Sequence, residues 1–145
     1  MNVLVDTSVW SLGFRRKAAQ LNPREQQVVS ELKELVREGR AYMIGLVRQE
    51  LLSGIRNREQ FERLKTKLRE FPDVPAEMAD HEAAAKASND CRAGGIVVSV
   101  IDILLYAIAS RHGMLIFSTD PDFATYARVL SLKLHKPRNF TTEAD

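Results

Sequence analysis

The segment VLVDTSVW, residues 3–10, carries the pattern that decides the fold. Three apolar residues run directly into Asp6, which is followed by the hydroxyl residues Thr7 and Ser8. A short unbroken apolar run is typical of a strand that is buried on both faces. An aspartate at the end of such a strand can cap the next helix, or it can be the first ligand of a metal site. The rest of the chain must supply partners for Asp6 if the second interpretation is right.

The same pattern of a short apolar run followed by a helical segment returns along the chain. Strands are predicted at 2–5, 42–46, 114–117 and 132–134, with a short extended approach at 96–98. Helices are predicted between them, at 9–16, from Pro23 to a stop at Gly39, around 47–55, and at 58–69, 79–93, 101–111 and 123–130. Continuous apolar strands that alternate with helices predict an α/β fold, with a central parallel β-sheet flanked by α-helices.

Length and composition restrict the class of protein. A chain of 145 residues is expected to form a single domain, residues 1–145. The sequence has no long uncharged apolar segment, so no membrane span is predicted, and its first residues do not resemble a secretory signal. The single cysteine, Cys91, excludes an internal disulfide and indicates a cytoplasmic location. The net charge of +2 does not by itself indicate a nucleic-acid partner.

Positive charge is nevertheless concentrated in one part of the chain. Between residues 56 and 70, six cations accompany only three glutamates, namely Arg56, Arg58, Arg63, Lys65, Lys67 and Arg69 with Glu59, Glu62 and Glu70. We interpret this cluster as a solvated helix face. A patch that contacts phosphates is the alternative.

Carboxylates follow the ends of the predicted strands. Asp6 follows the first strand, and Glu50 lies within a turn of the end of the second. Asp102 lies in the first turn of the 101–111 helix, while Asp120 and Asp122 follow the strand at 114–117. Because the carboxyl ends of parallel strands share one edge of a sheet, where ligands bind, we expect these acids to face one site.

Each acid also has a purely structural interpretation. Ser99 and Asp102 have the spacing of a capping box, and Asp120 followed by Pro121 is a typical helix start. Glu50 can be an ordinary surface residue on an amphipathic helix. Capping accounts for acids at helix starts, but it does not account for Glu50 or for the gathering of acids at one edge.

An acidic cluster of this kind indicates a particular chemistry. Neighbouring carboxylates repel one another and raise one another's pKa, and a divalent cation removes that conflict. Oxygen ligands without a histidine or cysteine cluster suit Mg²⁺ or Mn²⁺ rather than zinc. One or two such ions can activate a water and neutralise the charge on a phosphate under attack. The cluster therefore indicates hydrolysis of phosphodiester bonds.

Four segments in this order resemble the PIN-domain ribonucleases, and most closely the VapC-type toxins of toxin–antitoxin pairs: LVDTSVW, VRQELLSG, GGIVVSVIDILLYAIASRHG and LIFSTDPDF. No one motif is specific, but the ordered set is, and it spans Val3 to about Leu132. The resemblance implies a central parallel sheet flanked by helices and a Mg²⁺-dependent endoribonuclease, with Mn²⁺ as a substitute. It also implies an RNA substrate, a homodimer, and inhibition by a small DNA-binding antitoxin.

The resemblance also implies which residues form the site. It carries the family's catalytic acids onto Asp6, Glu50, Asp102 and Asp120, and its metal ligands onto Asp6, Asp102 and Asp120. Auxiliary positions fall on Asp122, Ser8 and Ser118, and the choice between Asp120 and Asp122 as the main fourth acid stays open.

The chain departs from the family pattern at two places. The usual alanine-rich start of the long helix is replaced by ILLY at 103–106, and Pro121 lies inside the fourth motif. Both changes leave the substrate preference open. A PIN-fold module that binds a partner without catalysis is the alternative function. A phosphatase with an aspartyl nucleophile is not supported, because no second acid follows two positions after Asp6.

Overall fold

A small parallel sheet lies at the centre of the structure, a computed structural model that describes residues 1–138. Its middle strand is β1 (Val3–Val5), which pairs in parallel with β2 (Ala41–Tyr42) and with β3 (Leu115–Phe117), in the order β2-β1-β3. Single parallel bridges, Met43 to Asp73 and Ile116 to Leu134, continue the pairing beyond these strands. All three residues of β1 are fully buried, as an apolar strand covered on both faces requires.

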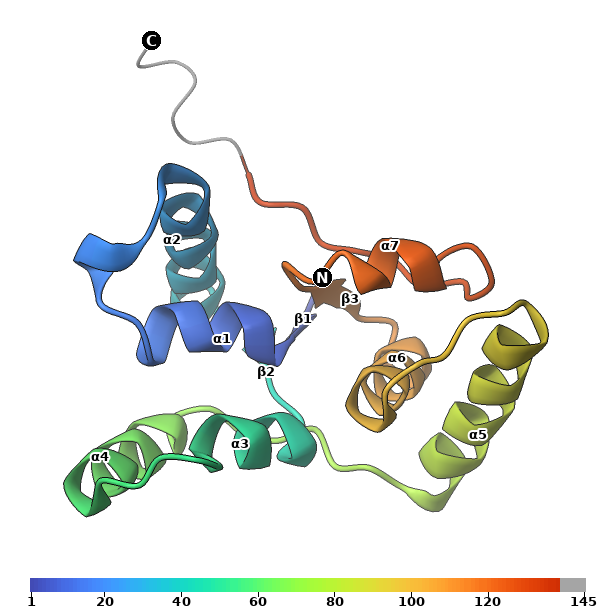
Figure 1. Cartoon of the computed structure of the whole chain (residues 1–145), viewed down its shortest axis with the longest axis horizontal. Helices are drawn as coiled ribbons and strands as arrows, with labels where there is room; N and C mark the ends of the chain where they lie inside the picture. Colours follow the sequence, from blue (N-terminus) through green and yellow to red (C-terminus); the bar gives the residue numbers. More distant parts are fainter. Residues whose placement is uncertain (139–145) are drawn as a thin grey trace, which may run out of the picture.

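Helices cover both sides of the sheet. Figure 1 shows α1 to α4 gathered on one side of the strands and α5 and α6 on the other, with α7 near β3. Their bounds are α1 Thr7–Phe14, α2 Pro23–Arg37, α3 Gly45–Leu52, α4 Arg58–Leu68, α5 Met78–Ala93, α6 Val100–His112 and α7 Asp122–Tyr126, with a 3₁₀ turn at Ala18–Gln20. The predicted α/β fold with a parallel sheet is confirmed. None of the helices within residues 1–138 has both the length and the apolar character needed to cross a membrane.

Two of the helix starts that the sequence predicted, those of α2 and α6, are present. The Asn22 side chain accepts a hydrogen bond from the Glu25 amide, and the Glu25 side chain accepts one from the Asn22 amide. This reciprocal capping box, with Pro23 at the first position, begins α2. At α6, Ser99 Oγ accepts a hydrogen bond of 3.1 Å from the Asp102 amide. The serine therefore caps α6, and the Asp102 carboxylate remains available for other contacts.

Several predicted boundaries were wrong, each for a local reason. Helix α1 begins at Thr7 rather than residue 9, because the Asp6 carbonyl already accepts hydrogen bonds from the amides of Val9 and Trp10. The second strand does not continue to 46, because the Ile44 carbonyl accepts from the amides of residues 47 and 48 and starts α3.

The C-terminal part of the described chain has less regular structure than predicted. The expected strand at 132–134 is reduced to the single bridge at Leu134, and α7 ends at Tyr126 instead of residue 130. The segment 96–98, predicted as an extended approach, pairs with no described strand, and the Ile96 amide donates to the Cys91 carbonyl at the end of α5.

Candidate active site

The predicted acids meet in one cavity beyond the carboxyl ends of the strands. This acidic cavity has a volume of about 750 Å³. The predicted acids that line it are Asp6, Glu50, Asp102, Asp120 and Asp122. The sheet topology therefore brings together side chains from the residue after β1, from α3 and α6, and from the segment that leads from β3 into α7. Gathering of the acids at one edge, as the sequence predicted, is confirmed.

Asp6 is the most enclosed of the five acids. Its exposed fraction is 5 %, and its Oδ2 accepts hydrogen bonds of 2.8 Å from Ser8 Oγ and 2.8 Å from Ser118 Oγ. Burial raises the pKa of Asp6 above its usual value, and the two serine hydroxyls partly oppose that shift. The side chain makes no capping bond, although the Asp6 backbone carbonyl starts α1. Asp6 thus caps the helix through its backbone and faces the cavity through its carboxylate.

Asp102 is held by a tyrosine that the sequence analysis did not select. Tyr126, at the end of α7, donates a hydrogen bond of 2.8 Å from its hydroxyl to Asp102 Oδ2. Burial raises the pKa of Asp102, the Tyr126 hydroxyl opposes this, and the negative charges of Asp6 and Asp120 raise it further. Burial and the Asp102 carboxylate in turn raise the pKa of Tyr126. Asp6 and Asp120 are therefore near enough to Asp102 for their charges to act on it.

The loop after β3 is organised by serine hydroxyls. Ser118 Oγ accepts a hydrogen bond of 3.0 Å from the Asp120 amide, and Ser8 Oγ accepts one of 3.1 Å from the Thr119 amide. Asp120 Oδ1 accepts a hydrogen bond of 2.9 Å from the Asp122 amide, so Asp120 also turns the chain into α7. Both predicted auxiliary serines therefore position this loop against Asp6.

The two acids of this loop differ in their surroundings. Asp120 is half-buried and its negative charge raises the pKa of Asp102, whereas Asp122 is exposed. Its surroundings favour Asp120 as the main fourth acid.

Glu50 lies at the rim of the cavity. It is exposed on α3, and its carboxylate forms no hydrogen bond or ion pair with the residues that the structure describes. Thr7 also lines the cavity, and its Oγ1 is the one buried side-chain polar atom within residues 1–138 that has no hydrogen-bond partner. A buried hydroxyl without a partner beside a set of carboxylates is a place that suits an ordered water or an ion.

The donor set fits a hydrated magnesium ion better than a fully coordinated one. Within residues 1–138, no three side chains of His, Cys, Asp or Glu lie close enough together to hold one ion. Mg²⁺ usually takes only one or two carboxylates and fills its other positions with water and substrate phosphate. Asp6 and Asp102, with oxygen as their only ligand atom, fit that requirement.

Comparison with known proteins shows the family of this chain. The family model "PIN domain" matches residues 3–129. A VapC ribonuclease of Mycobacterium bovis is 31 % identical over 133 residues, which is 90 % of this chain and 96 % of that protein.

Two solved structures have a similar fold. One is FitAcB from Neisseria gonorrhoeae, with a TM-score of 0.72, 21 % identity, and coverage of 93 % of this chain and 97 % of that chain. The other is a toxin–antitoxin complex from Klebsiella pneumoniae, with a TM-score of 0.67, 15 % identity, and coverage of 96 % and 100 %. The family match and the sequence relative together show that this chain belongs to the PIN-domain family, in which its relatives include VapC ribonucleases.

Proposed function

We propose that the protein is a Mg²⁺-dependent endoribonuclease and the toxin of a toxin–antitoxin pair. The observation that carries the proposal is the meeting of Asp6, Glu50, Asp102 and Asp120 in one cavity, at the sheet edge where α/β folds bind ligands. The ribonuclease name of a relative 31 % identical to this chain supports RNA as the substrate.

The predicted metal ligands are Asp6, Asp102 and Asp120. In this proposal Asp6 and Asp102 would hold the ion directly and Asp120 would contact it through a water, because no three of the described carboxylates lie close enough to ligate one ion together. Mn²⁺ is the proposed substitute for Mg²⁺. When bound, such an ion supplies a Lewis acid for the phosphate and lowers the pKa of a water. Ser8 and Ser118 keep Asp6 oriented toward the cavity, and Tyr126 does the same for Asp102. These hydroxyls are positioning groups rather than ligands.

Glu50 has a separate proposed role. It is the exposed carboxylate at the rim, without a partner among the described residues, so it is free to accept a proton from the attacking water. Water then attacks phosphorus, the bond to the leaving ribose oxygen breaks, and that oxygen takes up a proton from solvent, to which Glu50 releases the proton that it accepted. Asp122 supplies additional negative charge at the mouth of the cavity.

The partners follow from the same relationship. The structure from Klebsiella pneumoniae is a toxin–antitoxin complex, which supports an antitoxin partner for this chain. We further propose that the antitoxin is a small DNA-binding protein, that this protein forms a homodimer, and that it is cytoplasmic. The alternative function is a PIN-fold module that binds a partner without catalysis. The full set of acids in the cavity favours the nuclease.

The test is incubation of purified protein, free of antitoxin, with total cellular RNA in Mg²⁺ and in chelator. We expect discrete cleavage that requires the metal and is lost in Asp6→Asn and in Asp102→Asn. Asp90→Asn is the matched control, because Asp90 is an exposed acid paired with Lys86 on α5, outside the acidic cavity. Cleavage that survives chelation, or a site variant as active as Asp90→Asn, would exclude the proposed metal nuclease.

A further inference from the structure

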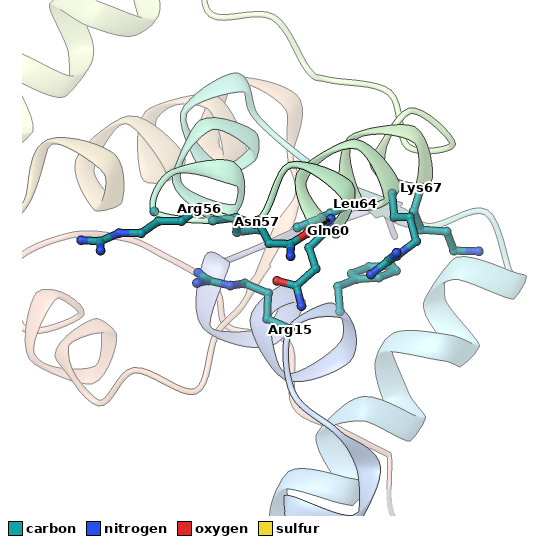
Figure 2. Close-up of a pocket in the computed structure, with 10 residues that line it drawn as sticks. Arg15, Arg56, Asn57, Gln60, Leu64 and Lys67 are labelled. Carbon is teal, nitrogen blue, oxygen red and sulfur yellow. Dashed lines mark hydrogen bonds between the residues drawn. The ribbon is translucent and has the colours of Figure 1, made fainter.

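A second cavity, lined by cations, lies between the end of α1 and α4. Its volume is about 700 Å³. Four cations line it, Arg15, Arg56, Arg63 and Lys67, and none of its lining residues is acidic. Figure 2 shows Arg15, from the end of α1, and Gln60, from α4, facing each other, with Arg56 at one end of the site and Lys67 at the other. We call this cavity the basic groove.

The charge of the basic groove is largely unneutralised. Arg15, Arg56 and Arg63 are exposed, and their guanidinium groups make no hydrogen bond or ion pair with the described part of the chain. Lys67 alone has a carboxylate partner, Glu70 at 3.3 Å. Elsewhere arginines such as Arg37, Arg40, Arg48 and Arg111 are each paired with an acid. The groove is therefore a place where an anion gains favourable electrostatic energy without displacing existing partners.

Two helices connect the basic groove to the acidic cavity. Helix α1 follows Asp6 and ends at Phe14, next to Arg15. Helix α3 carries Glu50 and ends at Leu52, and the chain then enters the groove at Gly54. Eight helical residues rise about 12 Å, and stacked nucleotides in one strand are separated by about 3.4 Å. The groove thus lies a few nucleotides from a phosphate in the acidic cavity.

We propose that the basic groove binds the sugar–phosphate backbone of the RNA substrate, a few nucleotides from the bond that is cut. This inference rests on the proposed nuclease function. The acidic cavity itself repels a polyanion, and the chain has a net charge of only +2, so affinity for RNA must come from a local concentration of cations. The arginines and Lys67 contact phosphates in this arrangement.

The remaining lining residues also suit a single strand of RNA. Gln60 offers an amide that can bond to a phosphate or a base edge, and Phe14 offers a half-buried ring. Grooves that bind single-stranded nucleic acid combine cations along the backbone with aromatic rings on which bases stack. An acidic protein segment would use the same cations, but it would have no need of a path from the groove to the metal site.

The test measures RNA binding in chelator, so that cleavage does not interfere. A labelled single-stranded RNA is titrated by fluorescence anisotropy over a range of salt concentrations, with the parent protein and Arg15→Gln/Arg63→Gln. We expect the double variant to bind about tenfold more weakly at low salt. The slope of log K against log salt should fall by about 1.4, because each lost single-strand phosphate contact removes about 0.7.

Two further variants keep the result interpretable. Lys86→Gln/Arg92→Gln removes two exposed cations from α5, on the other side of the molecule, and should bind RNA like the parent. Arg15→Lys/Arg63→Lys keeps both charges and should retain most of the affinity, which would exclude misfolding as the cause of the loss.

An unchanged salt slope in Arg15→Gln/Arg63→Gln would overturn the inference, as would an equal loss in the α5 control or a parent that binds no RNA. Weaker binding of a polyglutamate peptide without weaker binding of RNA would assign the groove to an acidic protein segment instead. Cleavage is measured separately in Mg²⁺ with the parent. If the parent binds RNA through the groove but does not cleave it, the proposed function is contradicted. If the parent cleaves RNA and the groove variants bind RNA as tightly as the parent does, only this inference is contradicted.

Discussion

Ser118 Oγ donates a hydrogen bond of 2.8 Å to Asp6 Oδ2 across 112 positions of sequence. The contact joins the loop after β3 to the residue after β1. These two strands are parallel neighbours, so their carboxyl ends lie side by side. Ser8 donates to the same oxygen, so one carboxylate is fixed by hydroxyls from both neighbouring segments. Asp6 is therefore the most firmly positioned acid of the cavity, and the other acids lie around it.

Replacing Ser118 by alanine should weaken catalysis without unfolding the protein. Ser118→Ala removes the donor to Asp6 and the acceptor for the Asp120 amide, so both acids lose orientation. We expect the cleavage rate in Mg²⁺ to fall about tenfold to a hundredfold, the range usual for residues that orient metal ligands. Ser110→Ala, at the far end of α6, is the control and should keep the parent rate. An equal rate in both variants would show that Ser118 does not position the site.

Replacing Asp6 by asparagine should stabilise the metal-free protein at neutral pH. Because burial raises the pKa of Asp6, the folded state holds a proton on this carboxyl more tightly than the unfolded state does. The associated stability is complete below the unfolded pKa, about 3.9, and is lost as pH rises through the folded pKa. In chelator, Asp6→Asn should melt above the parent at pH 7, and the difference should vanish below about pH 4.

Thermal melting across this pH range checks the prediction, and Mg²⁺ provides its counterpart. The ion should raise the melting temperature of the parent and not that of Asp6→Asn, because only the parent has the buried ligand. An Asp6→Asn variant that melts below the parent at pH 7 in chelator would show that the buried Asp6 carboxylate does not lower the stability of the folded protein.

Removal of the Tyr126 hydroxyl should have a small effect on folding and a larger one on the site. Tyr126 is buried, and its hydroxyl donates to Asp102. Tyr126→Phe should cost about 1 kcal/mol of unfolding free energy, as one hydrogen bond does, measured by urea denaturation. A loss of this size leaves almost all of the protein folded, so it should not by itself lower the cleavage rate. We nevertheless expect the cleavage rate to fall, because Asp102 loses the hydroxyl that orients it. Tyr106→Phe, also a tyrosine of the described chain but outside the acidic cavity, should match the parent in cleavage.

Glu31 anchors the end of the described chain to α2. It is fully buried, with its Oε2 lying 2.6 Å from His135 Nε2 and its Oε1 3.1 Å from Arg138 Nε. Glu31→Ala leaves both partners without this carboxylate, and we expect a loss of about 2 to 3 kcal/mol in urea denaturation. Glu34→Ala, which breaks an exposed pair with Arg37 on the same helix, should cost less than about 1 kcal/mol. Equal losses in the two variants would contradict this role of Glu31.

The sequence could predict the acidic cavity because the order of strands and helices determines which residues meet there. Short apolar strands that alternate with helices require a parallel sheet, and a parallel sheet places Asp6, Glu50, Asp102 and Asp120 at one edge. Which hydroxyls fix those acids is a different matter. Tyr126 reaches Asp102 only through the angle at which α7 packs, and no local pattern of residues determines that angle.

The basic groove shows the same limit. The cation cluster at 56–69 was interpreted as a solvated helix face, with a phosphate patch as the alternative. The structure places only part of it, Arg56, Arg63 and Lys67, around a cavity, and it adds Arg15 from a distant helix. The predicted strands are longer than the observed ones because the next helix begins soon after each strand ends. At the second strand, for example, the Ile44 carbonyl already accepts the first hydrogen bonds of α3.

The chemical nature of the newly formed RNA ends tests the central claim most directly. Purified protein cleaves one defined RNA in Mg²⁺, and the ends on each side of the cut are identified by mass spectrometry. Attack by water held in the acidic cavity, with O3′ as the leaving ribose oxygen, predicts a 5′-phosphate on one fragment and a 3′-hydroxyl on the other. A 2′,3′-cyclic phosphate, which forms when the neighbouring 2′-hydroxyl is the nucleophile, would contradict the account.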